Sequence, residues 1–132
     1  MSLMPGIRPL ALPRLPADFF LAPRDPAAPE PLRLEWPRRG PFRLKGDPSR
    51  HEAFRAAFAE YEAAEAAAAH CRCHGDLRGF FAAMTETHRC YAALEAFELP
   101  AADLARLQGL ARRHARDALR RERRDAEAAE AA

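Results

Sequence analysis

Histidine and cysteine side chains, which can bind metal ions or act as nucleophiles, gather in one part of this chain. Five of them lie within 20 residues, at Cys71, Cys73, His74, His88 and Cys90. Thiolate sulfur and imidazole nitrogen are the usual protein ligands of zinc, and a structural zinc site needs four such atoms at about 2.0 to 2.3 Å from one ion. The residue types suit a zinc site, and the spacing decides whether they can form one.

The spacing divides these residues between two predicted helices. A turn at Gly75 joins the helices in an antiparallel hairpin, with Asp76 capping the second one. His88 and Cys90 then lie 12 to 14 residues past the start of the turn, roughly 18 to 21 Å from Cys73 at about 1.5 Å of rise per residue. One ion cannot reach both groups, so a zinc site that uses all five residues is ruled out.

A smaller site on the first of these helices survives this geometry. His70 and His74 are four residues apart and therefore share one helix face. Cys71 and Cys73 are close by in the sequence. Metal sites usually need more than two ligands, whereas residues at a helix end commonly pack and cap. We therefore expect no metal ligand and no cofactor, and metal binding by these four residues is left open.

Neither His88 nor Cys90 has the setting of a catalytic residue. Two residues apart on a helix, they project from different sides, so we expect a buried Cys90 and a core His88. The chain has two serines and two threonines, and its six glycines are scattered. It has no phosphate-binding loop, dinucleotide fingerprint or HExxH zinc motif. The sequence predicts that the protein is not an enzyme.

Proline divides the chain into two physically different parts. Eleven of the twelve prolines fall between Pro5 and Pro48, and only Pro100 follows. Proline fixes φ and removes a backbone donor, so residues 1–48 cannot form a helix or a central strand. The chain has no valine and is rich in alanine, which favours helices over strands. We predict a mainly α fold, with an extended proline-rich arm at 1–48 and a helical body at 49–132.

The arm carries large apolar residues between its prolines, unlike an ordinary disordered linker. Such a segment suits docking on another protein, because proline lowers the entropy lost when an extended chain is bound. At residues 32–45, apolar and charged residues alternate on both sides of a Pro-Arg-Arg-Gly turn, which predicts a short β-hairpin. The residues predicted to bind partners are Leu10, Leu12, Leu15, Phe19, Phe20, Leu21, Trp36 and Phe42.

Three helices are predicted in the body. The first begins at an N-cap, Asp47 or Ser49, with Glu52 placed to complete a capping box with Ser49. The second runs to about Leu99, because a residue before a proline disfavours helical geometry, and Pro100 opens the third. We expect the second helix to bury one stripe, formed by Leu77, Phe81, Met84, His88, Tyr91 and Leu94.

The third predicted helix is rich in arginine, and its last part, residues 120–132, is either a solvated extension or a fraying end. Its basic residues are Arg112, Arg113, Arg116, Arg120, Arg121, Arg123 and Arg124. Such a helix could follow a phosphate backbone, but no aromatic residue accompanies it in the sequence for base stacking. Acidic residues are interleaved, and the formal charge of the chain is only +2. We expect a solvated helix face with salt bridges, with nucleic-acid binding as the alternative.

A binding arm on a helical body without a catalytic motif favours a function in assembly. We expect a non-enzymatic structural or assembly subunit of a larger protein complex, such as a phage virion or tail-connector component. Its partners would be other subunits of that complex or copies of itself. Pro5, Pro9, Pro13 and Pro16 would break the amphipathic helix of a transit peptide. No uninterrupted apolar stretch is long enough for a secretory signal peptide, and no segment has the roughly 20 apolar residues of a membrane span. The expected location is the cytoplasm or a virion.

Overall fold

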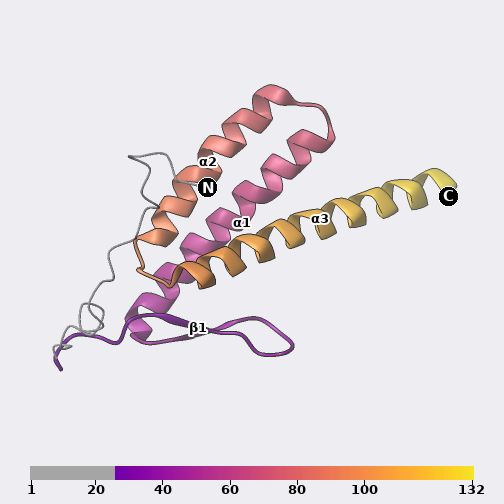
Figure 1. The fold of residues 1–132 in the computed structure, drawn as a ribbon. Coiled ribbons are helices and arrows are strands. Elements are labelled where there is room, and N and C mark those ends of the chain that lie inside the picture. The colour runs from indigo at the N-terminus through magenta and orange to yellow at the C-terminus, as the bar shows by residue number, and fades with distance from the viewer. Residues whose placement is uncertain (1–25) are drawn as a thin grey trace, which may run out of the picture.

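The computed structural model describes residues 26–132, which form three helices and a short β-hairpin (Figure 1). In chain order the elements are β1 Arg33–Glu35, β2 Arg43–Lys45, a 3₁₀ turn at Pro48–Arg50, α1 His51–Cys73, α2 Leu77–Glu95 and α3 Ala101–Ala131. α1 and α2 form an antiparallel hairpin, and α3 lies along α1 and runs in the same direction (Figure 1). The predicted mainly α fold is confirmed. Six of the residues predicted to bind partners lie in the arm outside the described residues: Leu10, Leu12, Leu15, Phe19, Phe20 and Leu21.

The predicted β-hairpin is present and packs on the helices. β1 and β2 pair antiparallel, and the turn between them passes through Gly40, whose φ of 99° lies in the region that favours glycine. The ring of Phe42 meets the rings of Phe54 and Phe58 on α1 edge to face, with centroids 6.3 and 5.4 Å apart. This contact gives the two-stranded ribbon the hydrophobic support that it needs to be stable.

α1 begins later than predicted. The Asp47 carboxylate accepts a hydrogen bond from the backbone N–H of Ser49 at 3.0 Å, which caps the 3₁₀ turn. This bond holds the pKa of the Asp47 carboxyl below its ordinary value. The α-helix starts at His51, and Arg50 at its N-cap makes no side-chain capping bond. The predicted capping box of Ser49 with Glu52 is therefore wrong, because Ser49 lies inside the preceding 3₁₀ turn.

The predicted turn between α1 and α2 is confirmed. Gly75 has a φ of 71°, and its N–H bonds to the carbonyl of Arg72 at 3.4 Å. The N–H of Asp76 bonds to the carbonyl of Cys71 at 2.9 Å, which completes a Schellman C-cap. The Asp76 carboxylate accepts from the N–H of Gly79 at 2.9 Å and caps α2. Hydrogen bonds therefore fix the backbone at the end of α1.

α2 ends at Glu95, before the predicted end at Leu99. The N–H groups of Phe97 and Glu98 bond to the carbonyls of Leu94 and Glu95 at 3.1 and 3.0 Å and close the last turn. Glu98 then adopts a φ of 59°, which turns the chain, and Leu99 enters the core with 7% of its surface exposed. The favourable free energy of burying Leu99 thus exceeds the cost of ending the helix at Glu95 and the strain of a glutamate in the left-handed region.

The hydrophobic core lies at one end of the molecule, where the hairpin, the start of α1, the end of α2 and the start of α3 meet (Figure 1). Its largest fully buried side chains are Leu32, Phe54, Tyr61, Leu94 and Leu107. Further along, the buried residues become small, with Ala64 and Ala68 on α1 and Ala111 and Ala115 on α3. Small residues let helices lie close together, but they bury little apolar area.

The buried face of α2 matches the predicted stripe only at its end, where Leu94 is buried and Tyr91 packs partly buried against the core. Its buried residues are Ala83, Thr87, Cys90 and Leu94. Leu77 and Phe81 are 69% and 66% exposed, and His88 is exposed as well. α2 packs against the alanine-rich side of α1, and small residues on α2 allow that close approach. The larger side chains at the start of α2 therefore lie outside the core.

Candidate functional site

Contacts between histidine and glutamate recur along the line where α1 meets α3. His114 Nδ1 and Glu62 Oε2 are 2.8 Å apart. Eight residues further along each helix, His70 Nδ1 lies 3.5 Å from Glu122 Oε2. Because each helix rises about 1.5 Å per residue, α1 and α3 keep one parallel register over roughly 12 Å. This register brings the end of α1 against the outer half of α3.

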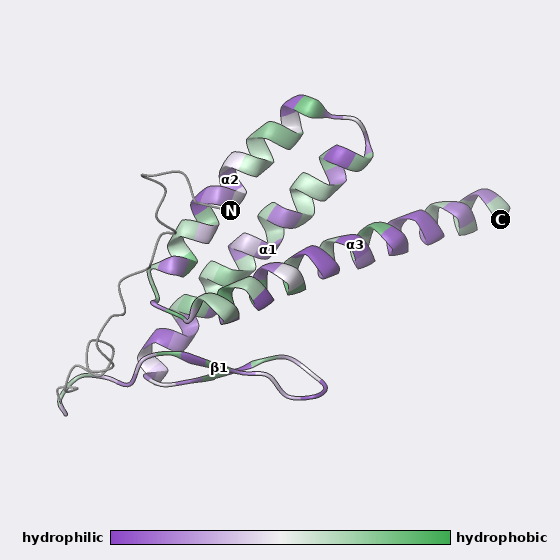
Figure 2. Ribbon diagram, viewed as in Figure 1, coloured by the Kyte–Doolittle hydropathy of each residue, from purple (hydrophilic) through white to green (hydrophobic). Residues whose placement is uncertain are grey.

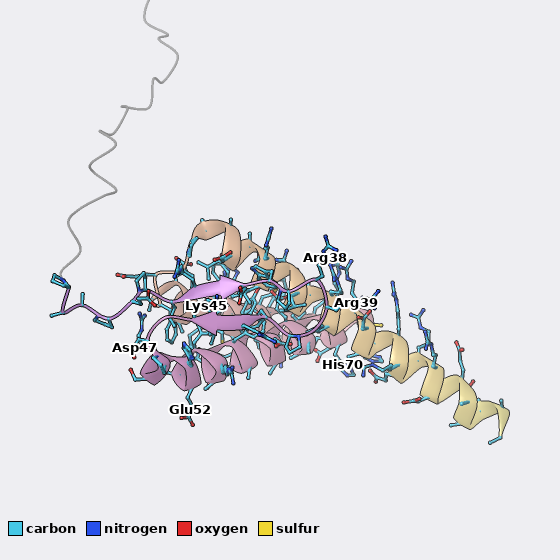
Figure 3. All side chains as sticks on the ribbon, turned by 90° about the horizontal axis from the view of Figure 1, so that it is seen from below. Arg38, Arg39, Lys45, Asp47, Glu52 and His70 are labelled. Atoms are coloured by element: carbon cyan, nitrogen blue, oxygen red, sulfur yellow. The ribbon has the colours of Figure 1, made fainter. Side chains whose placement is uncertain are left out.

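Two histidines of α1 and one acid of α3 form a group that we call the histidine cluster: His70, His74 and Glu122. Glu122 Oε1 lies 3.8 Å from His74 Nε2, and the two imidazole centroids are 4.3 Å apart. All three possible ligand atoms lie within 4.8 Å of one another. Figure 3 shows His70 beside the ribbon of α3. Within residues 26–132, this is the one group of three or more His, Cys, Asp or Glu side chains whose spacing could hold a metal ion.

The sequence predicts only part of the histidine cluster. The expectation that His70 and His74 share one helix face is confirmed by the contact between their rings. Glu122 lies 48 residues beyond His74, in a segment that the sequence leaves undecided between a solvated extension and a fraying end. The structure shows a helix there, and only the register of α3 on α1 brings Glu122 to the histidines.

The two cysteines near these histidines do not join the cluster. Cys71 Sγ faces the α1–α2 turn, where a Cβ added to Gly79 would lie 2.9 Å from it. Cys73 is exposed and lines an open hollow of about 240 Å³ beside the cluster. The hollow is lined by Cys73, His74, Leu119, Glu122, Arg123 and Ala126.

His88 and Cys90 lie on α2, outside the histidine cluster. The prediction of a buried Cys90 is confirmed, since it is 1% exposed. Burial raises the pKa of its thiol, so the thiol is protonated at neutral pH. The prediction of a core His88 is wrong: the side chain is exposed, because α2 turns a different face towards α1.

A second candidate site, which we call the basic cleft, lies where the hairpin meets α3. It is an open hollow of about 470 Å³ lined by Trp36, Arg106, Gly109, Leu110, Arg113 and Arg116. The guanidinium carbon of Arg106 lies 5.7 Å from the centroid of the Trp36 ring. Among residues 26–132, none of the three arginines forms an ion pair with a carboxylate. Arg38 and Arg39 add positive charge at the hairpin tip (Figure 3).

Only part of the predicted arginine set belongs to the basic cleft. Arg113 and Arg116 line it, whereas Arg112 contacts a glutamate of α1 at 3.7 Å. The remaining four, Arg120, Arg121, Arg123 and Arg124, lie on the exposed and largely hydrophilic end of α3 (Figure 2). The sequence shows no aromatic residue near these arginines, but the fold brings Trp36 to α3 from the hairpin. The sequence does not identify Arg106 as the partner of Trp36, because the hairpin and α3 meet only in the tertiary structure.

Exposed apolar side chains at the start of α2 form a third feature. Leu77 and Phe81 are one helical turn apart, and we call this pair the α2 apolar face. The ring of the half-buried Phe80 lies beside that of Phe81, with centroids 5.8 Å apart. Figure 2 shows the hydrophobic residues at this end of α2, and within residues 26–132 helix α3 packs mainly along α1.

The hairpin residues predicted to bind partners, Trp36 and Phe42, are half-buried in contacts within the chain. Their ring centroids are 5.7 Å apart, and Phe42 also packs on α1. Trp36 still lines the basic cleft. Their role in binding a partner stays a prediction.

Comparisons with protein-family models, with curated proteins and with solved structures found no match to this chain. Among residues 26–132, no helix combines the length and the apolar character that crossing a membrane requires. A function has to be inferred from the surfaces described above.

Proposed function

We propose that the protein is a non-enzymatic structural or assembly subunit of a larger protein complex, with the phage virion or tail-connector component expected from the sequence as one example. The observation that carries this proposal is the α2 apolar face, where Leu77 and Phe81 are 69% and 66% exposed. Two large apolar side chains on adjacent turns form a contiguous patch, and such patches often mark contacts with other proteins.

Burial of the α2 apolar face would contribute a moderate amount of binding free energy. Complete burial of a leucine or phenylalanine contributes about 1.5 to 3 kcal/mol, so these two partly exposed residues together contribute roughly 2 to 4 kcal/mol. The loss of translational and rotational freedom on association costs at least about 4 kcal/mol. A stable complex therefore needs further contacts, and we assign these to the apolar residues of the arm, among them Phe19 and Phe20.

The test compares the full chain with two variants, each purified through a tag from its native cells. Leu77→Ser/Phe81→Ser removes the α2 apolar face, and deletion of residues 2–25 removes the part of the arm that precedes the hairpin by several residues, so the hairpin is kept. Arg78→Ser, also exposed at the start of α2, is the matched control. Size-exclusion chromatography with light scattering gives the mass and stoichiometry of each preparation, and circular dichroism gives its helical content.

We expect the full chain and Arg78→Ser to purify in a complex of fixed stoichiometry. Both other variants should lose their partners while their helical content is unchanged. A monomeric full chain from native cells would contradict the assembly function. Retention of the complex by both variants would show that neither surface holds it.

Nucleic-acid binding is a second candidate function, and the basic cleft favours it. Three arginines that form no ion pair with a carboxylate of residues 26–132 can contact phosphates, and the face of Trp36 can stack on a base. Trp36 is the only tryptophan of the chain, so its fluorescence reports on the cleft. A single-stranded oligonucleotide should quench this fluorescence at low salt, and added salt should weaken the binding.

Two double variants assign such binding to the cleft or to the end of α3. Arg113→Glu/Arg116→Glu reverses charge in the cleft, and Arg123→Glu/Arg124→Glu reverses the same number of charges outside it. We expect the first variant to lose quenching and the second to keep most of it. The absence of quenching in the wild type at low salt, or equal losses in both variants, would contradict a nucleic-acid site in the cleft.

A further inference from the structure

We propose that the histidine cluster binds a divalent transition-metal ion, with Zn²⁺ as the expected metal. None of its residues belongs to the α2 apolar face or to the basic cleft. Metal binding and the assembly function can therefore be present or absent independently of one another.

The donor atoms are those of a zinc site with an open position. Two imidazole nitrogens and one carboxylate oxygen hold Zn²⁺ in some catalytic sites, where a water completes the tetrahedron. Calcium takes a shell of oxygen ligands, and magnesium keeps several waters around one or two carboxylates, so neither suits two imidazoles. Copper binds nitrogen and oxygen donors more tightly than zinc does, so the metal held in cells depends on supply. The cluster thus fits a borderline divalent ion such as Zn²⁺ or Cu²⁺.

The distances in this cluster lie within the range of an ion pair but leave its members without a direct hydrogen bond. The oxygens of Glu122 lie 3.5 and 3.8 Å from the nearest nitrogens of His70 and His74. Both distances exceed the hydrogen-bond range of about 2.7 to 3.2 Å, whereas the pair of His114 with Glu62 closes to 2.8 Å. Two tetrahedral ligands, each about 2.0 to 2.1 Å from zinc, lie about 3.3 Å from one another. One donor atom from each residue lies within 4.8 Å of the other two, so a small inward movement of the side chains brings the three donors to that separation.

Side-chain rotations can bring the donor atoms of the cluster closer together around an ion. The three side chains are each about half exposed, so packing does not fix their rotamers. His74 is the C-cap of α1, and the hydrogen bonds of Gly75 and Asp76 hold the backbone there. The backbone that carries the two histidines is therefore preformed, and metal binding would order their side chains and the segment of α3 that carries Glu122.

The hollow beside the cluster gives room for a fourth ligand. Its volume of about 240 Å³ admits water, and its wall includes His74, Glu122 and Cys73. A water from this hollow can complete the coordination, as in zinc sites with three protein ligands. The Cys73 thiol stands in the same wall and is the alternative fourth ligand, which spectroscopy can distinguish.

A metal in this position would join the end of α1 to the exposed half of α3. Beyond residue 120, α3 buries none of its side chains, so packing within residues 26–132 does little to hold that segment on α1. A metal that binds this folded arrangement and not the unfolded chain raises Tm by mass action. At a free zinc concentration about 100-fold above Kd, the expected rise is roughly 10 °C.

The experiment titrates chelator-treated protein with zinc chloride, and separately with cobalt chloride. Calorimetry gives the stoichiometry and Kd, thermal unfolding with and without zinc gives the change in Tm, and the visible spectrum of bound cobalt reports its ligands. We expect one metal per chain, a higher Tm with zinc and the spectrum of tetrahedral cobalt. A thiolate-to-cobalt band would identify Cys73 as the fourth ligand, and its absence would leave that position to water.

Variants of exposed residues assign the site without unfolding the protein. His70→Gln, His74→Gln and Glu122→Gln should each weaken binding by at least about 10-fold, the loss that even changes next to metal ligands produce. His114→Gln is the matched control, because it removes the other histidine that contacts a glutamate between α1 and α3. It should leave Kd unchanged. Circular dichroism confirms that each variant is folded.

Two results would overturn the proposal. One is a wild-type protein whose Tm and calorimetric trace do not respond to zinc at millimolar concentration. The other is a His70→Gln/His74→Gln variant that binds zinc as tightly as the wild type. If Cys71→Ser/Cys73→Ser then abolishes that binding, the cysteines hold the metal and the histidine cluster does not.

Discussion

Removal of the Tyr61 hydroxyl is expected to destabilise the protein through the buried acid that it contacts. Tyr61 is 0% exposed, and its hydroxyl donates a hydrogen bond to Glu65 Oε1 at 2.8 Å. Glu65 is itself buried, and its charged neighbour is Arg112, whose Nε lies 3.7 Å from the same oxygen. Burial, followed by the bond to Glu65, raises the pKa of Tyr61, so the hydroxyl is a donor at neutral pH.

Tyr61→Phe removes this donor and keeps the packing of the ring. A hydrogen bond to a charged group contributes about 1.5 to 3 kcal/mol, and its loss leaves a buried carboxylate short of one donor. The free energy of unfolding should therefore fall by about 2 kcal/mol, and Tm by roughly 10 °C. Arg112→Met removes an exposed partner that lies beyond hydrogen-bond distance, so it should cost less than about 1 kcal/mol.

Urea denaturation followed by circular dichroism measures both variants beside the wild type. Glu65→Gln retains an acceptor for the Tyr61 hydroxyl, so we expect a smaller loss than in Tyr61→Phe. A Tyr61→Phe variant within about 0.5 kcal/mol of the wild type would refute the role of the hydroxyl. An Arg112→Met variant less stable than Tyr61→Phe would show that the ion pair, and not the hydroxyl, holds Glu65.

Three further predictions concern the backbone and a cap. At Gly46, φ is 115° and a Cβ would lie 2.5 Å from the carbonyl oxygen of Pro31, so Gly46→Ala should cost more than about 2 kcal/mol in urea denaturation. Gly40→Ala, at a φ of 99° but in open space, should cost only about 1 kcal/mol, and equal losses would contradict the clash. Glu98→Gly relieves a left-handed glutamate with a φ of 59°, so Tm should rise by a few degrees in a thermal scan. The capping bond lowers the pKa of Asp47 below 3.8, so its contribution to stability is complete above that pH and is lost as the pH falls through the folded-state pKa. Urea midpoints of the wild type and Asp47→Asn should therefore converge at low pH.

Turns and helix boundaries were predictable where the chemistry is local. Gly75 supplies the left-handed residue and Asp76 the cap, so the break between α1 and α2 follows from two neighbouring residues. Alternation of apolar and charged residues is equally local, and it identified the hairpin. The end of α2 was missed, because the position of Glu98 depends on the burial of Leu99 in a core that four elements build together.

Only the end of the buried face of α2, at Cys90 and Leu94, was predicted, because helical periodicity does not identify which face a partner covers. Leu77 and Phe81 follow the helical period and are the largest apolar residues at the start of α2, so they resemble a core stripe. The alanine-rich side of α1 instead accepts Ala83 and Thr87, since small residues permit closer packing. Size matching between two helices is a tertiary property.

The same reason limits the prediction of both candidate sites. The spacing of His70 and His74 is local, and the sequence identified it. Glu122 joins them only through the register of α3 on α1, and Trp36 reaches Arg106 only through the docking of the hairpin. Neither contact follows from a pattern of neighbouring residues in the sequence. The third metal donor and the aromatic wall of the basic cleft could therefore be identified only from the structure.

The uneven distribution of large apolar residues connects the fold to its surfaces. α1 carries Phe54, Phe58 and Tyr61 in its first half and buries only alanines and Glu65 after them, so the far end of the molecule is held by small side chains and polar pairs. Segments with so little buried area open at low free energy. The α2 apolar face and the histidine cluster both lie at this end, where a partner or a metal that adds about 2 kcal/mol would suppress opening roughly 30-fold. Packing on alanine is also what lets α3 approach α1 closely enough for Glu122 to reach the two histidines, so the weakness of this end and its capacity to bind have one physical cause.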